Sequence, residues 1–151
     1  WIHASYTLLA ALARRGALPE APSGARESSS DVRRALRLAA RAGEAPFVVD
    51  RDGRAVKLPS GERLDLSRKG AVRRILVALA RARLDAPGRA LSLDELVAAG
   101  WPGERLLAEA GQKRAYTAVW ALRGQVFGER LLTRDDGYLL DPAVPVRFED
   151  L

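Results

Sequence analysis

The sequence contains no cysteine, which excludes a disulfide framework, a thiolate metal site and a cysteine nucleophile. It has a single histidine, His3, and shows neither the spacing of a metal site nor a phosphate-binding glycine loop. No apolar run approaches the roughly 20 residues that a membrane-spanning helix needs, and residues 1–18 lack the features of a signal peptide. We therefore expect a soluble cytoplasmic protein without a metal, a cofactor or enzymatic activity.

Methionine is also absent, and the chain begins with Trp1. We expect the 151 residues to be part of a longer protein whose upstream region is missing. This length is sufficient for one domain of ordinary size, with a core that needs no covalent support.

The balance of charge is basic, with a formal net charge of +6, which suits a polyanionic partner such as nucleic acid. Arginine outnumbers lysine by 22 to 3, a bias that a GC-rich genome produces whatever the function. Residues 1–45 carry 7 basic and 4 acidic side chains, and residues 46–151 carry 18 and 15. Any basic patch must therefore arise from the placement of charges.

The first 45 residues read as a helical extension and linker that precede a domain over residues 46–151. Strong helix formers over residues 4–15 stop at Gly16, and residues 19–30 are rich in proline, glycine and serine. Ser30 or Asp31 then caps a second helix that ends at Gly43.

An antiparallel β-meander begins at Phe47, where the hydrophobic period changes from 3.6 to 2. The strands predicted over residues 47–51 and 54–58 flank Asp52–Gly53, a pair typical of a type I′ turn with positive φ at both positions. A further turn leads into a third strand over residues 62–66.

Three helices follow the meander. The first begins at Ser67 and stops before Pro87, and its apolar stripe includes Val72, Ile75, Leu76 and Leu79. Ser92 and Glu95 form a capping box that starts the second helix, which ends at Gly100. The third is predicted over residues 111–127.

The third helix has two distinct faces. Its predicted core stripe consists of Ala115, Ala118, Val119, Leu122 and Val126. The opposite face carries Lys113, Thr117, Trp120 and Gly124, with Tyr116 and Arg123 at its flanks. This pattern fits a helix in the major groove and equally an ordinary amphipathic surface helix. We expect Trp120 to be covered by the hairpin or by residues 1–45, the alternative being contact with the DNA backbone or a partner protein.

The segment 131–140 is predicted to form a hairpin directly after the third helix. Asp136–Gly137 supplies a type I′ turn, which pairs Asp135 with Tyr138 and Arg134 with Leu139. Thr133, Arg134 and Tyr138 near its tip could reach phosphates or the minor groove. The alternative is an edge hairpin with a solvated tip.

A family resemblance rests on four stretches: residues 88–96, residues 100–102, residues 121–123, and residues 132–134 followed by residues 137–140. Together they resemble the OmpR/PhoB-type winged helix-turn-helix domain, especially the version in actinobacterial antibiotic regulatory proteins, over about residues 47–142. The resemblance implies an α+β fold with a four-stranded N-terminal sheet, three helices and a C-terminal hairpin wing. It also implies binding to direct repeats of double-stranded DNA, as a dimer, with the third helix in the major groove.

Several residues acquire roles from this resemblance. Lys113 matches the basic residue that opens the recognition helix, Arg123 matches a phosphate-contacting arginine, and Thr133 and Tyr138 lie in the wing. RNA polymerase and an upstream signalling domain are further implied partners.

We therefore predict the DNA-binding output domain of a transcriptional regulator. The predicted DNA contacts are Lys113, Arg114, Thr117, Trp120, Arg123, Thr133, Arg134 and Tyr138. The alternative is a winged-helix module that docks another protein through Trp120, Tyr116 and the wing, without DNA.

Overall fold

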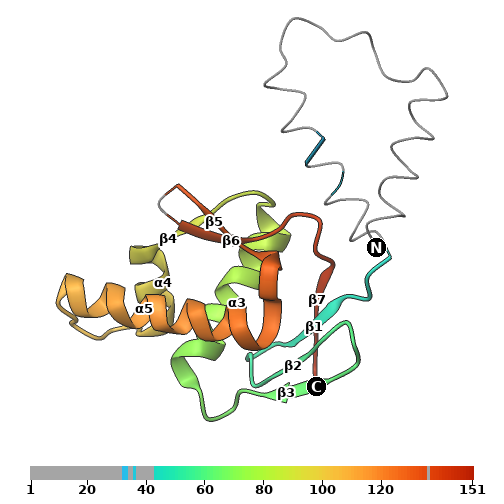
Figure 1. Ribbon diagram of the computed structural model, residues 1–151. Coiled ribbons are helices and arrows are strands. Elements are labelled where there is room, and N and C mark those ends of the chain that lie inside the picture. The colour runs from blue at the N-terminus through green and yellow to red at the C-terminus, as the bar shows by residue number, and fades with distance from the viewer. Residues whose placement is uncertain (1–31, 34–35, 37–42, 136) are drawn as a thin grey trace, which may run out of the picture. The chain divides into compact units, whose positions relative to one another are not determined.

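The structure, a computed structural model, describes residues 32–33, 36, 43–135 and 137–151 (Figure 1). The chain divides into two compact units, Trp1–Glu44 and Ala45–Leu151. The helix predicted over residues 4–15 and the linker lie outside the described residues. So does most of the helix predicted to end at Gly43, although the backbone of Val32, Arg33 and Leu36 is helical.

The unit Ala45–Leu151 is an α+β structure with three α-helices and two β-sheets among its described residues. The helices are α3 (Gly70–Asp85), α4 (Leu93–Gly100) and α5 (Ala108–Leu122). The strands are β1 (Phe47–Asp50), β2 (Ala55–Lys57), β3 (Arg63–Asp65), β4 (Leu91–Ser92), β5 (Leu131–Arg134), β6 (Gly137–Leu140) and β7 (Val146–Glu149). None of the described helices has the length and apolar character that crossing a membrane requires.

The first sheet has the strand order β3-β2-β1-β7. Its antiparallel β1, β2 and β3 confirm the predicted meander. The sheet has four strands, but the fourth is β7 from the end of the chain, which pairs in parallel with β1 and places Phe47 opposite Val146. The expectation of a four-stranded sheet built wholly from N-terminal segments is therefore wrong, because the inner strand β1 completes its hydrogen bonding with a C-terminal strand.

The turn between β1 and β2 differs from the predicted type I′ turn. Gly53 has a φ of +73°, but Asp52 is not among the described residues with positive φ. The Asp50 carboxylate accepts hydrogen bonds from the backbone N–H groups of Asp52 and Arg54, which organises a longer turn. A Cβ on Gly53 would lie 2.7 Å from the Arg73 carbonyl oxygen, so this turn requires glycine where it packs against α3.

The second sheet has the order β4-β6-β5, and the register of its hairpin differs by two residues from the predicted register. Thr133 pairs with Tyr138 and Arg134 pairs with Gly137, so the predicted Asp135–Tyr138 and Arg134–Leu139 pairs are wrong. A Cβ on Gly137 would clash with the Leu91 carbonyl oxygen. The glycine therefore lies in the strand, where it permits the close approach of β4, and not in the turn.

Helix α3 contacts both other helices, β6 of the second sheet and β7 of the first (Figure 1). Its predicted stripe is confirmed at Ile75, Leu76 and Leu79, which are buried, whereas Val72 is half-buried. The helix begins at Gly70 and not at the predicted Ser67, because the Asp65 carboxylate accepts a hydrogen bond from the Ser67 backbone in a turn before the helix.

Helix α4 begins with the predicted capping box. The Ser92 hydroxyl accepts a hydrogen bond from the Glu95 backbone N–H at 3.1 Å, and the Ser92 backbone N–H donates to the Glu95 carboxylate at 2.8 Å. The hydrogen bond that the Ser92 backbone N–H donates lowers the pKa of Glu95 below its usual value, and the positive charge of nearby Arg89 lowers it further. Two otherwise unpaired amides at the helix start are thereby satisfied.

Helix α5 begins at Ala108, three residues before the predicted start, and ends at Leu122 in place of Phe127. A π-helical turn, Arg123–Phe127, continues it and is followed by a 3₁₀ turn, Gly128–Arg130. All five members of the predicted core stripe are buried, as is Phe127. Phe127 is the additional inward residue. The π turn accounts for it, because a π-helix fits more residues into each turn than an α-helix does.

The contact between Gly137 and β4 leads to a stability prediction. We expect Gly137→Ala to lower the free energy of unfolding by about 1–3 kcal/mol, because the new methyl group must force β4 and β6 apart. Urea denaturation of the full chain measures this change. Gly124→Ala is the matched control, since nothing lies within 4 Å of its Cβ position, and it should change stability by less than about 1 kcal/mol. Equal losses in both variants would contradict this account.

Candidate nucleic-acid interface

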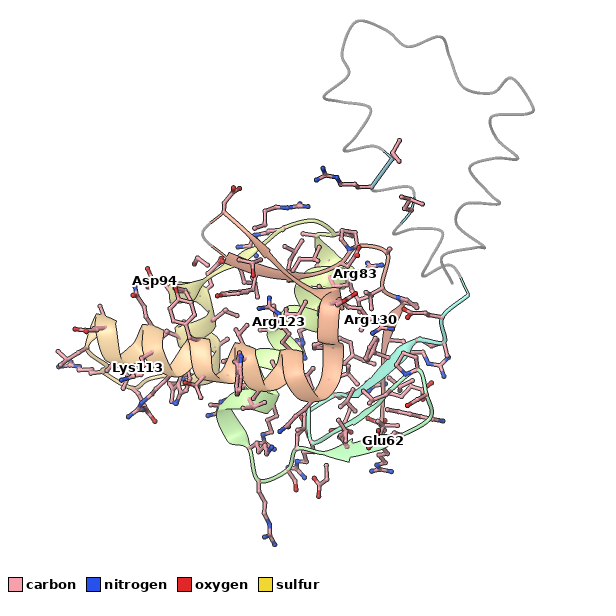
Figure 2. All side chains as sticks on the ribbon, in the orientation of Figure 1. Glu62, Arg83, Asp94, Lys113, Arg123 and Arg130 are labelled. Atoms are coloured by element: carbon pink, nitrogen blue, oxygen red, sulfur yellow. The ribbon has the colours of Figure 1, made fainter. Side chains whose placement is uncertain are left out.

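The face of α5 opposite its buried stripe is exposed, as the sequence pattern predicted. Lys113, Arg114 and Thr117 are exposed, and Trp120 keeps 78% of its surface accessible. Figure 2 shows Lys113 in the N-terminal half of α5. The hairpin does not cover Trp120, so that part of the expectation is wrong, because the ring points away from the core stripe of its own unit. Cover of Trp120 by residues 1–45 stays a prediction.

Two polar side chains of this face, Arg114 and Thr117, already have partners within the protein. Arg114 forms an ion pair with Glu104 at 3.6 Å, and both side chains are about half exposed. The Thr117 hydroxyl donates to the Lys113 carbonyl oxygen at 3.0 Å, so it faces solvent as a hydrogen-bond acceptor. An exposed ion pair of this kind is weak, and Arg114 can exchange its partner for another anion at little cost.

Arg123 joins the end of α5 to the hairpin (Figure 2). Its Nε and Nη2 donate to the Leu131 carbonyl oxygen at 3.2 and 2.8 Å, and Nη2 also donates to the Thr133 hydroxyl oxygen at 3.0 Å. The guanidinium carbon lies 5.8 Å from the centre of the Tyr138 ring, within cation–π range. Arg123 therefore links the helix to both strands of the hairpin, and its implied contact with phosphate stays a prediction.

Tyr138 of β6 faces α5. Its ring lies edge-on to that of Tyr116, with the centroids 6.4 Å apart and an interplanar angle of 88°, an arrangement that aromatic pairs favour. Partial burial raises the pKa of Tyr138, and proximity to Tyr116 raises it further. The phenol is consequently neutral at physiological pH and acts as a hydrogen-bond donor or acceptor.

The other predicted wing residue, Arg134, lies near the hairpin tip. Its side chain is exposed, and its Nη1 donates to the Gly88 carbonyl oxygen at 3.5 Å, the long limit for a hydrogen bond. Thr133 is also exposed and accepts the bond from Arg123. Both residues are accessible from solvent at the hairpin.

The structure gathers half of the predicted site residues around one hollow of about 340 Å³ between α5 and β6. The hollow is lined by Tyr116, Thr117, Val119, Trp120, Arg123 and Tyr138. Lys113 and Arg114 line a different, more apolar groove together with Ala71, Val72 and Trp101, with Thr117 shared between the two. Thr133 and Arg134 line neither of these two hollows.

Sequence reasoning did not select two residues of this surface as DNA contacts. Tyr116, which it placed at the flank of the helix, is 51% exposed and lies edge-on to Tyr138 of the hairpin. Lys69 precedes α3, and its Nζ donates to the Gln125 amide oxygen at 3.1 Å, which adds a positive charge near the C-terminal end of α5. No local pattern could reveal Lys69, because 56 positions separate it from Gln125.

Comparison of the chain with protein-family models, curated proteins and solved structures finds no match. In the part of the chain that the structure describes, no group of three or more histidine or carboxylate side chains is placed to hold a metal ion. The interpretation of this surface therefore depends on its own geometry and charge.

The contacts of Arg123 predict a stabilising role for this side chain. Arg123→Ala should lower the free energy of unfolding by about 1–3 kcal/mol, because the Leu131 carbonyl loses a charged donor. Arg123→Lys should recover only part of the loss, since one ammonium group cannot reproduce the forked contact. Urea denaturation measures both changes.

The matched control for Arg123 is Arg147→Ala. Arg147 pairs with Glu149 at 3.0 Å on the surface of β7, and a pair so exposed contributes at most about 1 kcal/mol. A loss in Arg123→Ala no larger than that in the control would show that Arg123 does not hold the hairpin.

Proposed function

We propose that the unit Ala45–Leu151 is the DNA-binding output domain of a transcriptional regulator, with a winged helix-turn-helix of the OmpR/PhoB type. In this proposal α5 enters the major groove, and the β5–β6 hairpin is the wing, which contacts the backbone or the minor groove. The domain acts in the cytoplasm, without catalysis or a cofactor. Its further partners are a second copy on a direct repeat, RNA polymerase and an upstream signalling domain.

The observation that carries this proposal is the exposed face of α5 beside a hairpin that is held to the same helix. Lys113 and Thr117 lie on that face, and both are accessible. Lysine can donate to guanine acceptors in the major groove, and threonine can meet a base edge or the thymine methyl group. The order of three helices followed by a hairpin also supports the proposal, because it places an exposed helix directly before the wing.

The positive charges on this surface also support double-stranded DNA as the partner. Lys113 and Arg114 near the start of α5 and Lys69 near its end are spread along the helix, and Arg134 adds a cation at the hairpin. Cations placed along a helix and its neighbouring hairpin can meet successive phosphates of a duplex.

The test is selection of bound duplexes from a random pool by the full chain, followed by a salt titration on the selected sequence. The logarithm of the affinity should fall linearly with the logarithm of salt concentration, with a slope of about −0.9 for each phosphate neutralised. Lys113→Ala should weaken binding to the selected duplex roughly tenfold, as loss of a base contact does.

Lys57→Ala is the matched control for Lys113→Ala, because Lys57 is an exposed lysine on β2 of the other sheet. It should bind the selected duplex as tightly as the unchanged chain. Failure to enrich any duplex, an affinity that does not depend on salt, or equal effects of the two lysine substitutions would contradict the proposal.

A second candidate function is docking of another protein, and one observation favours it. Trp120 and Tyr116 are 78% and 51% exposed and lie on the same face of α5, and exposed aromatic clusters mark interaction surfaces. In a variant with Trp1 and Trp101 changed to phenylalanine, fluorescence reports on Trp120 alone. A shift of its emission on addition of a copurifying protein, with no duplex enriched, would favour docking over DNA binding.

A further inference from the structure

The hollow between α5 and β6 has an unusual combination of walls. Three aromatic rings, those of Tyr116, Trp120 and Tyr138, line it together with the Arg123 guanidinium and the Thr117 hydroxyl. No carboxylate is among its lining residues. The volume of about 340 Å³ is sufficient for a planar group the size of a nucleobase.

Among the described residues that line the hollow, Trp120 is the one aromatic side chain without a ring or cation partner. Tyr138 is partly buried and is packed by Tyr116 and Arg123, whereas Trp120 leaves 78% of its surface to water. A large aromatic side chain gains free energy when a flat apolar surface covers it. The hollow therefore presents one exposed aromatic ring beside Tyr116, Arg123 and Tyr138, which already contact one another.

The chemistry of the walls selects among possible ligands. A cationic group such as a methylated ammonium favours an aromatic cage, but here the fixed guanidinium of Arg123 would repel it. An aliphatic side chain would cover the rings but would leave the Thr117 oxygen and the tyrosine hydroxyls without partners. A nucleotide suits all of these groups. Its base has a π-face that can stack on the Trp120 ring and polar edges that can bond to the hydroxyls, and its phosphate can pair with the Arg123 guanidinium.

A base within a paired duplex cannot bind in this way, because its two faces are stacked on its neighbours. We propose that this hollow binds an unpaired nucleobase of DNA, stacked on Trp120, with its phosphate near Arg123. The inference rests on the proposed function and adds a preference for DNA in which a base is already unpaired. Such a base can come from a single strand or from a locally opened duplex.

Three DNA probes distinguish these sources in fluorescence-anisotropy titrations of the full chain. They are the selected duplex, the same duplex with one bulged nucleotide, and a single strand of the same sequence. The bulged duplex should bind roughly tenfold more tightly than the paired one, as a single base–aromatic stack implies. Tighter binding of the single strand than of the paired duplex would support the inference with a single strand as the source.

Substitutions at Trp120 test whether the ring causes the preference. Trp120→Ala should remove the preference for the bulged duplex, whereas Trp120→Phe should retain most of it because phenylalanine also stacks. Leu107→Ala is the matched control, since Leu107 is 81% exposed at the start of α5 and lines no part of the hollow. It should leave all affinities unchanged.

The outcomes separate this inference from the proposed function. Equal affinity for all three probes, or a preference for unpaired bases that persists in Trp120→Ala, overturns the inference and leaves DNA binding intact. Failure of the chain to bind any of the three probes overturns both. If Trp120→Ala instead abolishes a self-association seen by sedimentation, the ring belongs to a protein interface, and the inference is wrong.

Discussion

The direction in which α5 presents its exposed face depends on one packing constraint, the burial of its opposite stripe in the core around α3. Ala115, Val119 and Leu122 are almost completely buried, and so are Ile75 and Leu76 of α3. Rotating α5 about its axis would expose several of these side chains, at a cost of about 1.5–3 kcal/mol for each large one. The apolar core therefore determines that Trp120 faces outward, although Trp120 is not part of that core.

The hairpin requires support of its own, because two strands alone are only marginally stable in water. Strand β4 supplies part of it through the close contact at Gly137, and the buried Leu131 and Leu140 anchor both strands in the core. Arg123 adds hydrogen bonds from the end of α5. A residue that the family resemblance implied as a phosphate ligand thus has an internal structural role. The same arginine packs against Tyr138, so one guanidinium group both lines the hollow and binds the hairpin.

The parts of the fold that could be predicted from the sequence are those set by neighbouring residues. The capping box at Ser92 and Glu95 needs only a spacing of three, and the buried stripe of α5 needs only a helical period. The register of the hairpin was predicted wrongly, because an Asp–Gly pair favours a turn while the contact with β4 requires Gly137 in the strand. Much of the candidate site was predicted as a list of residues, but its division between two separate hollows was not.

By itself, the sequence determined the order of β1 to β3, the three helices and the β5–β6 hairpin, and which face of α5 is buried. It did not indicate β4 or β7, but it placed every helix boundary except the end of α5 to within three residues. Such features follow from periodicity and capping, which act over a few residues. Only the tertiary structure decided that Phe47 pairs with Val146, that Arg123 binds the hairpin and that the hairpin leaves Trp120 uncovered. The physical reason is that each of these depends on segments brought together by folding of the whole unit, and no local pattern records which segments will meet.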